Sequence, residues 1–226
     1  MADSPRIWVV IAAYNEARVI ARVVGEVARR GYHVVVVDDG SGDGTADHAA
    51  TAAAVVRHPV NLGQGAALQT GIDYALHQGA DVIVTFDADG QHRASDIERL
   101  VAALREAPAD FALGSRFLGD AIALSTARRL LLRAATLFTQ LTTGLRLTDT
   151  HNGLRAMTRH GAEKIRLRQN RMAHASEILA QIAASGLSYV EVPVQIEYTA
   201  YSLAKGQRLG DALAILLDLF ARRLYR

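Results

Sequence analysis

Continuous runs of apolar residues alternate with segments of helical periodicity through the first half of the 226-residue chain. Apolar runs without polar interruptions are typical of strands that are buried on both faces of a parallel sheet. The predicted strands cover residues 7–13, 34–37, 54–57, 82–86 and 111–114. The predicted helices cover about 15–30, 45 onward, 64–78 and 94–106. This alternation predicts an α/β fold with a mostly parallel central sheet and helices on both faces.

Polar clusters follow three of these predicted strands. They are Tyr14-Asn15-Glu16, Asp38-Asp39-Gly40-Ser41 and Asp87-Ala88-Asp89-Gly90-Gln91. The carboxyl ends of parallel strands meet at one edge of a sheet, where α/β proteins bind ligands. A single aspartate at a strand end is most often the N-cap of the next helix. Five carboxylates at one edge repel one another unless a cation or hydrogen-bond donors neutralise them, so the clusters together predict a ligand site.

The segment from Asp87 to Gln91 has the composition of a divalent-cation site. Asp89 and the amide oxygen of Gln91 are hard oxygen ligands, which Mg²⁺ or Mn²⁺ combines with substrate phosphate and water. In an extended segment Asp87 points the same way as Asp89, so Asp87 either contacts a ribose or reaches the cation through water. Imidazole is a poor ligand for such a cation, and His92 is interpreted as a loop histidine. The segment therefore predicts a metal and diphosphate site.

Several other classes of protein are excluded by what the sequence lacks. No Gly-x-Gly-x-x-Gly follows the first strand, and no Gly-x-x-x-x-Gly-Lys-Ser/Thr occurs anywhere. The absence of cysteine excludes disulfides and thiolate metal sites. No signal-peptide pattern opens the chain, and no apolar run reaches the roughly 18 residues that span a bilayer. We therefore expect a cytoplasmic chain that forms a single domain over residues 1–226.

The charges are unevenly distributed. Residues 1–112 carry nine arginines against fifteen acidic residues, a balance of −6, whereas residues 113–226 carry sixteen basic and eight acidic residues, a balance of +8. Leucine-rich stretches at 124–138 and 209–226 each contain three arginines. Basic amphipathic helices of this kind lie in membrane interfaces, although a core helix or a dimer contact has the same pattern. No aromatic and basic platform for nucleic acid is present, so an anionic membrane surface is the favoured partner.

Six motifs stand in the order that is known from one enzyme family. They are Ala12-Ala13-Tyr14-Asn15-Glu16, Asp38-Asp39-Gly40-Ser41, Asn61-Leu62-Gly63-Gln64-Gly65, Asp87-Ala88-Asp89-Gly90-Gln91-His92, Gly114-Ser115-Arg116-Phe117 and Asp149-Thr150-His151-Asn152-Gly153-Leu154-Arg155. On these motifs, residues 7–205 resemble the family 2 inverting glycosyltransferases, and most closely the dolichyl- or polyprenyl-phosphate sugar synthases. The resemblance implies a GT-A fold, with a nucleotide-sugar half over about 1–118 and an acceptor- and membrane-facing half over about 119–226.

The resemblance also implies roles for single residues on the donor side. Asp89 and Gln91 would bind the metal, and Asp89 would act in catalysis through it. The nucleotide-sugar would be bound by the residues at the three strand ends, namely Ala12, Tyr14, Glu16, Val37, Asp39, Asp87 and Ala88.

On the acceptor side, the resemblance implies that Arg116 faces the acceptor or the donor phosphate and that Arg155 and Lys205 bind the acceptor phosphate. Arg116 and Asp149 would also act in catalysis. A guanidinium matches phosphate oxygens well, but a structural ion pair between Arg116 and one of the crowded aspartates at the strand ends is the alternative. The lipid-phosphate enzymes carry an arginine six residues before the lysine, where this chain has Thr199. Gln207 and Arg208 lie close to Lys205 and could supply the missing contact.

The expected reaction moves a hexose from a UDP- or GDP-linked donor to polyprenyl phosphate at the inner face of the cytoplasmic membrane, with or without a membrane-spanning partner protein. A lipid phosphate is already ionised near pH 7 and needs no strong base. A saccharide or other hydroxyl acceptor would need one, and Asp149 and His151 are the candidates, unless their segment is simply a capped turn. The alternative of another class is a non-catalytic sugar-nucleotide-binding module, against which the intact Asp87, Asp89 and Gln91 argue.

Overall fold

One mixed sheet organises the computed structural model, which describes residues 4–118, 126–169 and 173–197, without the side chains of 126–132. Within these residues seven strands lie in the order β3-β2-β1-β4-β6-β5-β7. The strands are β1 (Ile7–Ala13), β2 (His33–Asp38), β3 (Ala54–Arg57), β4 (Val82–Thr85), β5 (Phe111–Ser115), β6 (Arg155–Thr158) and β7 (Tyr189–Pro193). The helices are α1 (Ile20–Ala28), α2 (Thr45–Ala49), α3 (Gln64–His77), α4 (Asp96–Glu106), α5 (Thr126–Thr143), α6 (Arg159–Lys164) and α7 (Ala173–Ala184).

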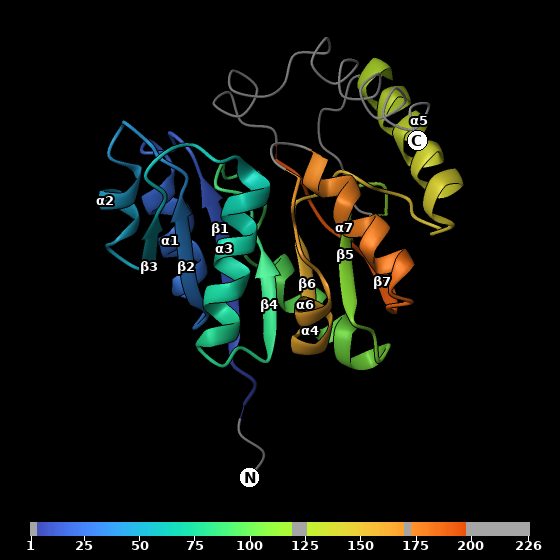
Figure 1. Cartoon of the computed structure of the whole chain (residues 1–226), viewed down its shortest axis with the longest axis horizontal. Helices are drawn as coiled ribbons and strands as arrows, with labels where there is room; N and C mark the ends of the chain where they lie inside the picture. Colours follow the sequence, from blue (N-terminus) through green and yellow to red (C-terminus); the bar gives the residue numbers. More distant parts are fainter. Residues whose placement is uncertain (1–3, 119–125, 170–172, 198–226) are drawn as a thin grey trace.

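Six of the seven described strands run in the same direction (Figure 1). The strand β1 pairs in parallel with β2 and β4, β2 with β3, and β5 with β7. The strand β6 lies between β4 and β5 and is antiparallel to both. The mostly parallel sheet that the apolar runs predicted is therefore confirmed.

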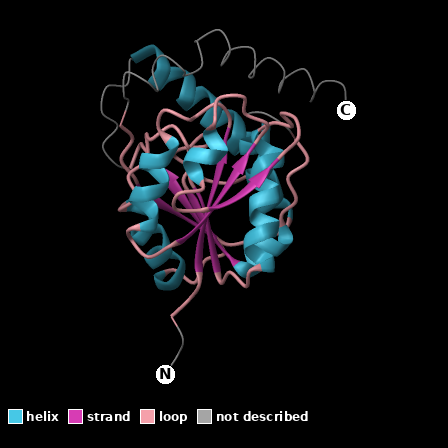
Figure 2. Ribbon diagram, turned by 90° about the vertical axis from the view of Figure 1, so that its left-hand side faces the viewer, coloured by secondary structure: helices cyan, strands magenta, loops and turns pink. Residues whose placement is uncertain are grey.

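Helices cover both faces of the sheet, as Figure 2 shows from the β3 edge. Alternate residues of β1 enter different cores: Val9 packs in the core that includes residues of α1 and α4, and Val10 in the core of α3, α6 and α7. The α3 helix comes very close to the sheet, because a Cβ at Gly71 would lie 2.2 Å from Cγ1 of Val10. This close packing fixes the N-terminal end of α3 over the carboxyl ends of β1 and β2.

The first predicted helix starts later than its periodicity indicated. The prediction began at about residue 15, but α1 begins at Ile20. The N–H of Asn15 donates to Oγ of Ser41 at 2.9 Å, and Asn15 has a positive φ of 53° that no helix continues. The N–H of Glu16 donates to Oγ1 of Thr45 at 2.8 Å. The polar clusters after β1 and β2 are therefore bonded directly to each other.

The second half differs more from the prediction. The structure forms β6, α6, α7 and β7, none of which the apolar pattern predicted. The segment 149–155, interpreted as a loop, leads directly into β6 at Arg155. The stretch predicted to be helical at 124–138 contains α5, which continues to Thr143. The second basic amphipathic helix, predicted at 209–226, and Lys205 lie outside the described residues.

Candidate active site

A cavity of about 490 Å³ lies where the carboxyl ends of β1, β2 and β4 face β6 and the start of α7. Its walls come from six segments that are far apart in the sequence. The lining residues are Ala12, Ala13, Tyr14, Glu16, Asp39, Asn61, Gly63, Gln64, Ala67, Asp87, Ala88, Asp89, His151, Gly153, Arg155, His174 and Ala175.

At the β2 end of the cavity, Asp39 fixes the loop between β3 and α3. Oδ1 of Asp39 accepts hydrogen bonds from the N–H of Leu62 at 2.9 Å and from Nδ1 of His58 at 2.8 Å. Oδ2 accepts the N–H of Gly63 at 2.7 Å. Asp39 is buried, and His58 is held in turn by Oγ1 of Thr70 at 3.0 Å. Asp39 therefore shapes this end of the cavity and also lines it.

Next along the sheet, Asp87 is held by protein groups on several sides. Nε2 of His92 donates to Oδ2 of Asp87 at 2.9 Å, and a Cβ at Gly153 would lie 2.2 Å from the same oxygen. Burial alone would raise the pKa of Asp87, but the bond from His92 and the charges of Arg155 and His174 lower it below its usual range. The Asp87 side chain is 30% exposed, toward the cavity, and remains ionised.

Asp89 has a different environment from Asp87, although only Ala88 separates them. Burial and the charges of Asp87 and Glu16 raise the pKa of Asp89 to about 6. Gln91 orients this carboxylate, since its N–H donates to Oδ1 at 3.0 Å and its Nε2 to Oδ2 at 2.7 Å. Asp87 thus has a histidine as a hydrogen-bond partner, whereas the partner of Asp89 is the neutral amide of Gln91.

The donor set at Asp89 fits a divalent cation such as Mg²⁺ or Mn²⁺. A cation would relieve the repulsion that raises the pKa of Asp89, and carboxylate and amide oxygens are hard ligands. Within the described residues, no group of three or more His, Cys, Asp or Glu side chains could hold a metal. A metal here would therefore be bound by Asp89 and would take its other ligands from substrate phosphate and water. Gln91, the other predicted ligand, donates its amide nitrogen to Asp89 and does not line the cavity.

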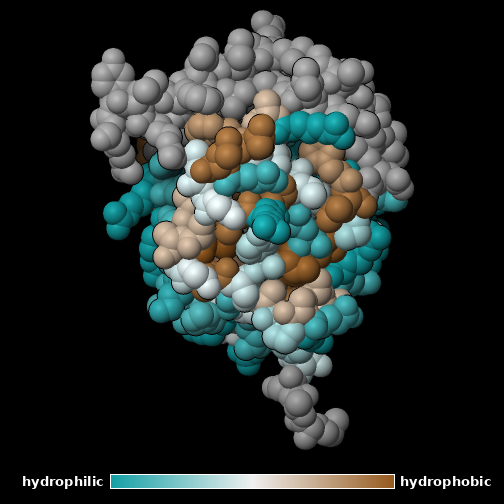
Figure 3. Space-filling view, turned by 90° about the vertical axis from the view of Figure 1, so that its right-hand side faces the viewer, coloured by the Kyte–Doolittle hydropathy of each residue, from teal (hydrophilic) through white to brown (hydrophobic). Residues whose placement is uncertain are grey.

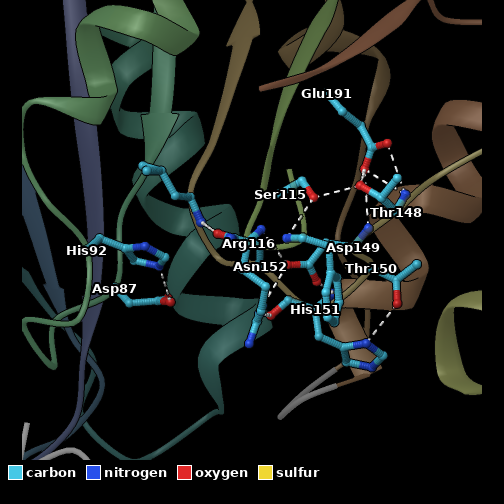
Figure 4. A network of polar contacts seen from close by, with 12 residues as sticks. Asp87, His92, Ser115, Arg116, Thr148, Asp149, Thr150, His151, Asn152 and Glu191 are labelled. Atoms are coloured by element: carbon cyan, nitrogen blue, oxygen red, sulfur yellow. Dashed lines mark hydrogen bonds and ion pairs between the residues drawn. The ribbon is translucent and has the colours of Figure 1, made fainter. Parts of the chain in front are cut away.

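A buried ion pair holds the segment that leads into β6 (Figure 4). Nε of Arg116 lies 2.6 Å from Oδ2 of Asp149, and both side chains are buried. Nη2 of Arg116 also donates to the carbonyl of His151 at 2.9 Å. Glu191 on β7 accepts the N–H of Thr148 at 2.8 Å and that of Asp149 at 3.2 Å. Arg116 therefore forms a structural ion pair, as in the alternative interpretation, but its partner is Asp149 and not one of the crowded aspartates at the strand ends.

Two side chains of this segment reach the cavity. The ring of His151 lines it and shares a hydrogen bond of 2.8 Å between Nδ1 and Oγ1 of Thr150. Burial lowers the pKa of His151, so the ring is neutral near pH 7. Arg155 also lines the cavity and is only 3% exposed, and its Nη1 has no hydrogen-bond partner among the described residues.

The cavity brings together most of the residues that the sequence assigned to it. Those that line it are Ala12, Tyr14, Glu16, Asp39, Asp87, Ala88, Asp89 and Arg155. Among the described residues, those assigned to the site that do not line it are Val37, Gln91, Arg116 and Asp149. Val37 is fully buried within β2 beneath α3.

Sequence reasoning gave no role to several lining residues. Asn61, Gly63 and Gln64 stand in a motif that was recognised, but His174 and Ala175 stand in none. The N-terminal end of α7 reaches the cavity because α3 offers no side chain at Gly65, where a Cβ would lie 3.0 Å from Cβ of His174. In the sequence, Gly65 is the signal that could have indicated the close contact between α3 and α7.

Comparison with known proteins identifies the family. The model of glycosyl transferase family 2 matches residues 8–166. A UDP-N-acetylglucosamine–dolichyl-phosphate N-acetylglucosaminyltransferase of Methanococcus voltae is 31% identical over 247 residues, which cover 99% of this chain and 98% of that protein. A polyprenol monophosphomannose synthase of Mycolicibacterium smegmatis is 34% identical over 224 residues, which cover 92% of this chain and 84% of that protein.

Solved structures agree on the architecture. The glucosyl-3-phosphoglycerate synthase of Mycobacterium tuberculosis, determined with Mn²⁺ and UDP-glucose, superposes with a TM-score of 0.74 at 19% identity. The superposition covers 97% of this chain and 79% of that one. At this identity the likeness concerns the fold. The chain therefore belongs to glycosyl transferase family 2, and it is a glycosyltransferase with the GT-A fold.

Proposed function

We propose that this glycosyltransferase moves a hexose from a UDP- or GDP-linked donor to polyprenyl phosphate, using Mg²⁺ or Mn²⁺. The main observation is that carboxylates from three strand ends, Glu16, Asp39 and Asp89, line one cavity. The names of two relatives, which are dolichyl-phosphate and polyprenol-phosphate sugar transferases, support the acceptor class. Asp39 and Tyr14 at one end of the cavity could contact a nucleoside, and Asp89, whose charge neighbouring carboxylates repel, could bind the metal of a nucleoside diphosphate.

The donor fits the order of the strands. The base and ribose would lie near Asp39 on β2 and Tyr14 after β1, and the diphosphate near Asp89 after β4. The sugar would then point toward β6, where Arg155 and His151 line the cavity. In this proposal, the nucleotide half, about residues 1–118, would bind the donor, and the acceptor half, about residues 119–226, would bind the acceptor.

In the proposed inverting reaction, an acceptor oxygen forms a bond to the anomeric carbon while the bond from that carbon to the diphosphate breaks. The departing nucleoside diphosphate takes the electron pair and gains negative charge. A divalent cation supplies neutralisation of that charge when it is bound. Gln91 orients Asp89 for this task, and His92 fixes Asp87 beside it. A lipid phosphate attacks as an anion, so the chain need not supply a base.

We also propose that the protein works at the inner face of the cytoplasmic membrane, with its basic half toward anionic lipid. No described helix is long and apolar enough to cross a membrane. The α5 helix exposes Leu137 and Leu141, at 56% and 76%, and Arg133 lies one turn earlier on the same side. Figure 3 shows hydrophobic side chains among hydrophilic ones on the face at the β7 edge. An exposed apolar and basic helix face supports peripheral binding, and a membrane-spanning partner protein could replace it.

The test is a transfer assay with purified protein, Mn²⁺, a panel of nucleotide-sugars and polyprenyl phosphate. Mass spectrometry should detect a polyprenyl-phosphate hexose with one of the donors. Asp89→Asn should yield none, while Asp47→Asn, at an exposed carboxylate on α2, should match the wild type. Product that forms only with sugar acceptors would refute the lipid-phosphate assignment.

A second candidate, transfer to a saccharide or other hydroxyl acceptor, is favoured by one observation. The neutral ring of His151 lines the cavity and could take the proton of a hydroxyl group, whereas Asp149, the other candidate base, is paired with Arg116 and does not line it. His151→Gln separates the two, because it should abolish transfer to a hydroxyl group and leave transfer to a phosphate largely intact.

A further inference from the structure

Asp39 lines the cavity, but the protein itself uses most of the hydrogen bonds that this carboxylate can accept. A carboxylate accepts about four hydrogen bonds, two on each oxygen. Oδ1 of Asp39 accepts two, from Nδ1 of His58 at 2.8 Å and from the N–H of Leu62 at 2.9 Å. Oδ2 accepts one, from the N–H of Gly63 at 2.7 Å. No other group among the described residues donates to this carboxylate, so one acceptor position remains, and it belongs to Oδ2.

His58 is the side chain that completes the set of donors on Oδ1. It directly follows β3, and its N–H donates to the carbonyl of Asp38 at 2.9 Å, which anchors the residue beside the end of β2. Its side chain is 9% exposed, and that of Asp39 is 3% exposed. Nε2 of His58 lies 3.0 Å from Oγ1 of Thr70 on α3, so both ring nitrogens have partners. His58 does not line the cavity and acts on it through Asp39.

Guanine and uracil present different donors to a carboxylate. The edge of guanine carries two adjacent donors, N1–H and an N2–H, which together pair with both oxygens of one carboxylate. The edge of uracil carries a single donor, N3–H, between two carbonyl oxygens. A carboxylate with one open acceptor position satisfies uracil but leaves one donor of guanine without a partner. Because an unpaired buried donor weakens binding, such a carboxylate distinguishes the two bases.

We propose that His58 makes the site selective for a uracil nucleotide over a guanine nucleotide, because it occupies Oδ1 of Asp39 and leaves a single acceptor for N3–H. The inference rests on the proposed function, since it requires the base to lie at Asp39, and it narrows the UDP- or GDP-linked donor to a UDP-linked one. In this role His58 is a positioning residue, because it contacts Asp39 and not the nucleotide.

The first part of the experiment uses the wild type and free nucleotides, so it does not depend on which sugar is transferred. Calorimetry with Mn²⁺ measures the affinities for UDP and for GDP. UDP should bind roughly 10- to 100-fold more tightly than GDP, which corresponds to one buried donor without a partner. A UDP that carries a methyl group on N3 has no donor at that position, and it should bind more weakly than UDP by a similar factor.

The second part tests His58 through the ratio of the two affinities. His58→Leu frees Oδ1 of Asp39 and should remove most of the preference for UDP, whereas a purely structural loss would weaken both nucleotides equally and leave the ratio unchanged. His58→Asn should keep the preference, because its amide can donate to Oδ1 in place of Nδ1. His160→Leu is the matched control, because it removes a histidine 2.9 Å from an aspartate, Asp110, that precedes β5 and does not line the cavity.

Circular dichroism checks the fold of each variant. If His58→Leu does not fold, Thr70→Val decides the role of His58, because it removes the partner of Nε2 and should lower the preference for UDP in the same direction.

Equal affinity of the wild type for UDP and GDP, or a preference for GDP, would overturn the inference and leave the nucleotide donor of the proposed function in place. Asp39 would then contact a group that both nucleotides share, such as a ribose hydroxyl. A folded His58→Leu variant with the full preference for UDP would overturn the role of His58. Failure of the wild type to bind either nucleotide would refute the proposed function together with this inference.

Discussion

The two walls of the cavity are built in different ways. The wall at the ends of β1, β2 and β4, called the carboxylate wall, carries Glu16, Asp39, Asp87 and Asp89, each shortly after the end of a strand. The other wall, called the nitrogen wall, carries Arg155 of β6, His151 from the segment before it and His174 of α7. That wall depends on contacts between distant residues, such as Arg116 with Asp149 and Glu191 with Thr148. One wall is thus fixed by local sequence and the other by tertiary structure.

We expect the carboxylate wall to bind the nucleotide of the donor and the nitrogen wall to contact the sugar and the acceptor. Strand ends hold Asp39 and Asp89 rigidly, as a site for a nucleotide and its cation requires. The nitrogen wall sits on a segment that side chains of β5 and β7 hold in place. Changes in those supporting contacts would alter the second wall and leave the first intact.

The largest effect is expected at the carboxylate wall. Asp89→Asn should lower kcat by about 1,000-fold, because it removes the charged oxygen ligand that stabilises the departing diphosphate through the metal. Steady-state kinetics with saturating donor and Mn²⁺ measures it. Asp47→Asn is the control, and a loss below about tenfold in Asp89→Asn would mean that the metal is held elsewhere.

Changes in the contacts that support the nitrogen wall should mainly lower the stability of the fold. Arg116→Met leaves Asp149 buried without its partner and should cost about 3–5 kcal/mol of unfolding free energy. Urea unfolding followed by circular dichroism measures it. Arg166→Met, which breaks an exposed pair with Asp73, should cost less than about 1 kcal/mol.

Combining Arg116→Met with Asp149→Leu should recover part of the lost stability, since no buried charge then lacks a partner. A double variant no more stable than Arg116→Met alone would mean that the pair is not the support of this wall.

The two walls touch at Gly153 and Asp87. Gly153→Ala would place a Cβ 2.2 Å from Oδ2 of Asp87, so the carboxylate or the segment must move. We expect the variant to lose about 1–3 kcal/mol of unfolding free energy. Its affinity for the nucleotide-sugar should fall more than its affinity for the free nucleotide. Calorimetry on both ligands measures the second effect. Gly42→Ala is the matched control, because a Cβ at Gly42 would have no atom within 4 Å. Equal behaviour of the two variants would mean that the contact of Gly153 with Asp87 does not couple the two walls.

The smallest effect is a pH dependence of the nitrogen wall. Burial lowers the pKa of His151 below its usual 6.5, so the unfolded chain binds more protons on acidification. Stability therefore falls as the pH drops below about 6.5, with a slope from this group of at most about 1.4 kcal/mol per pH unit. Melting curves between pH 5 and 7.5 should show a smaller slope in His151→Gln than in the wild type. An unchanged slope would mean that His151 is not buried as described.

The carboxylate wall could be predicted because its causes are local. Val34 to Val37 form a run that fits a strand buried on both faces, and Asp38 and Asp39 mark its end. The predicted start of α1 was wrong, because the N–H of Asn15 donates a hydrogen bond to Oγ of Ser41, 26 residues later in the chain. A helical period does not reveal such a contact.

The nitrogen wall could not be predicted for the same reason, at a larger scale. The strand β6 has four residues, and it is buried although it starts with an arginine. A buried arginine in a short strand breaks the apolar pattern on which the prediction relied. His174 enters the cavity only because α3 has a glycine, Gly65, at the crossing point. An ion pair of Arg116 with a strand-end aspartate could be named as an alternative, but its actual partner, Asp149, was not predicted, because the two residues lie 33 positions apart in the sequence.

The central claim is that a donor lies across the cavity from the carboxylate wall to the nitrogen wall. A crystal structure with Mn²⁺ and the nucleotide-sugar that binds most tightly tests it most directly. The account predicts the base near Asp39, the metal on Asp89 and the sugar within hydrogen-bond distance of the wall that contains Arg155. A donor with its metal on other residues, or with its sugar turned away from β6 and α7, would contradict it.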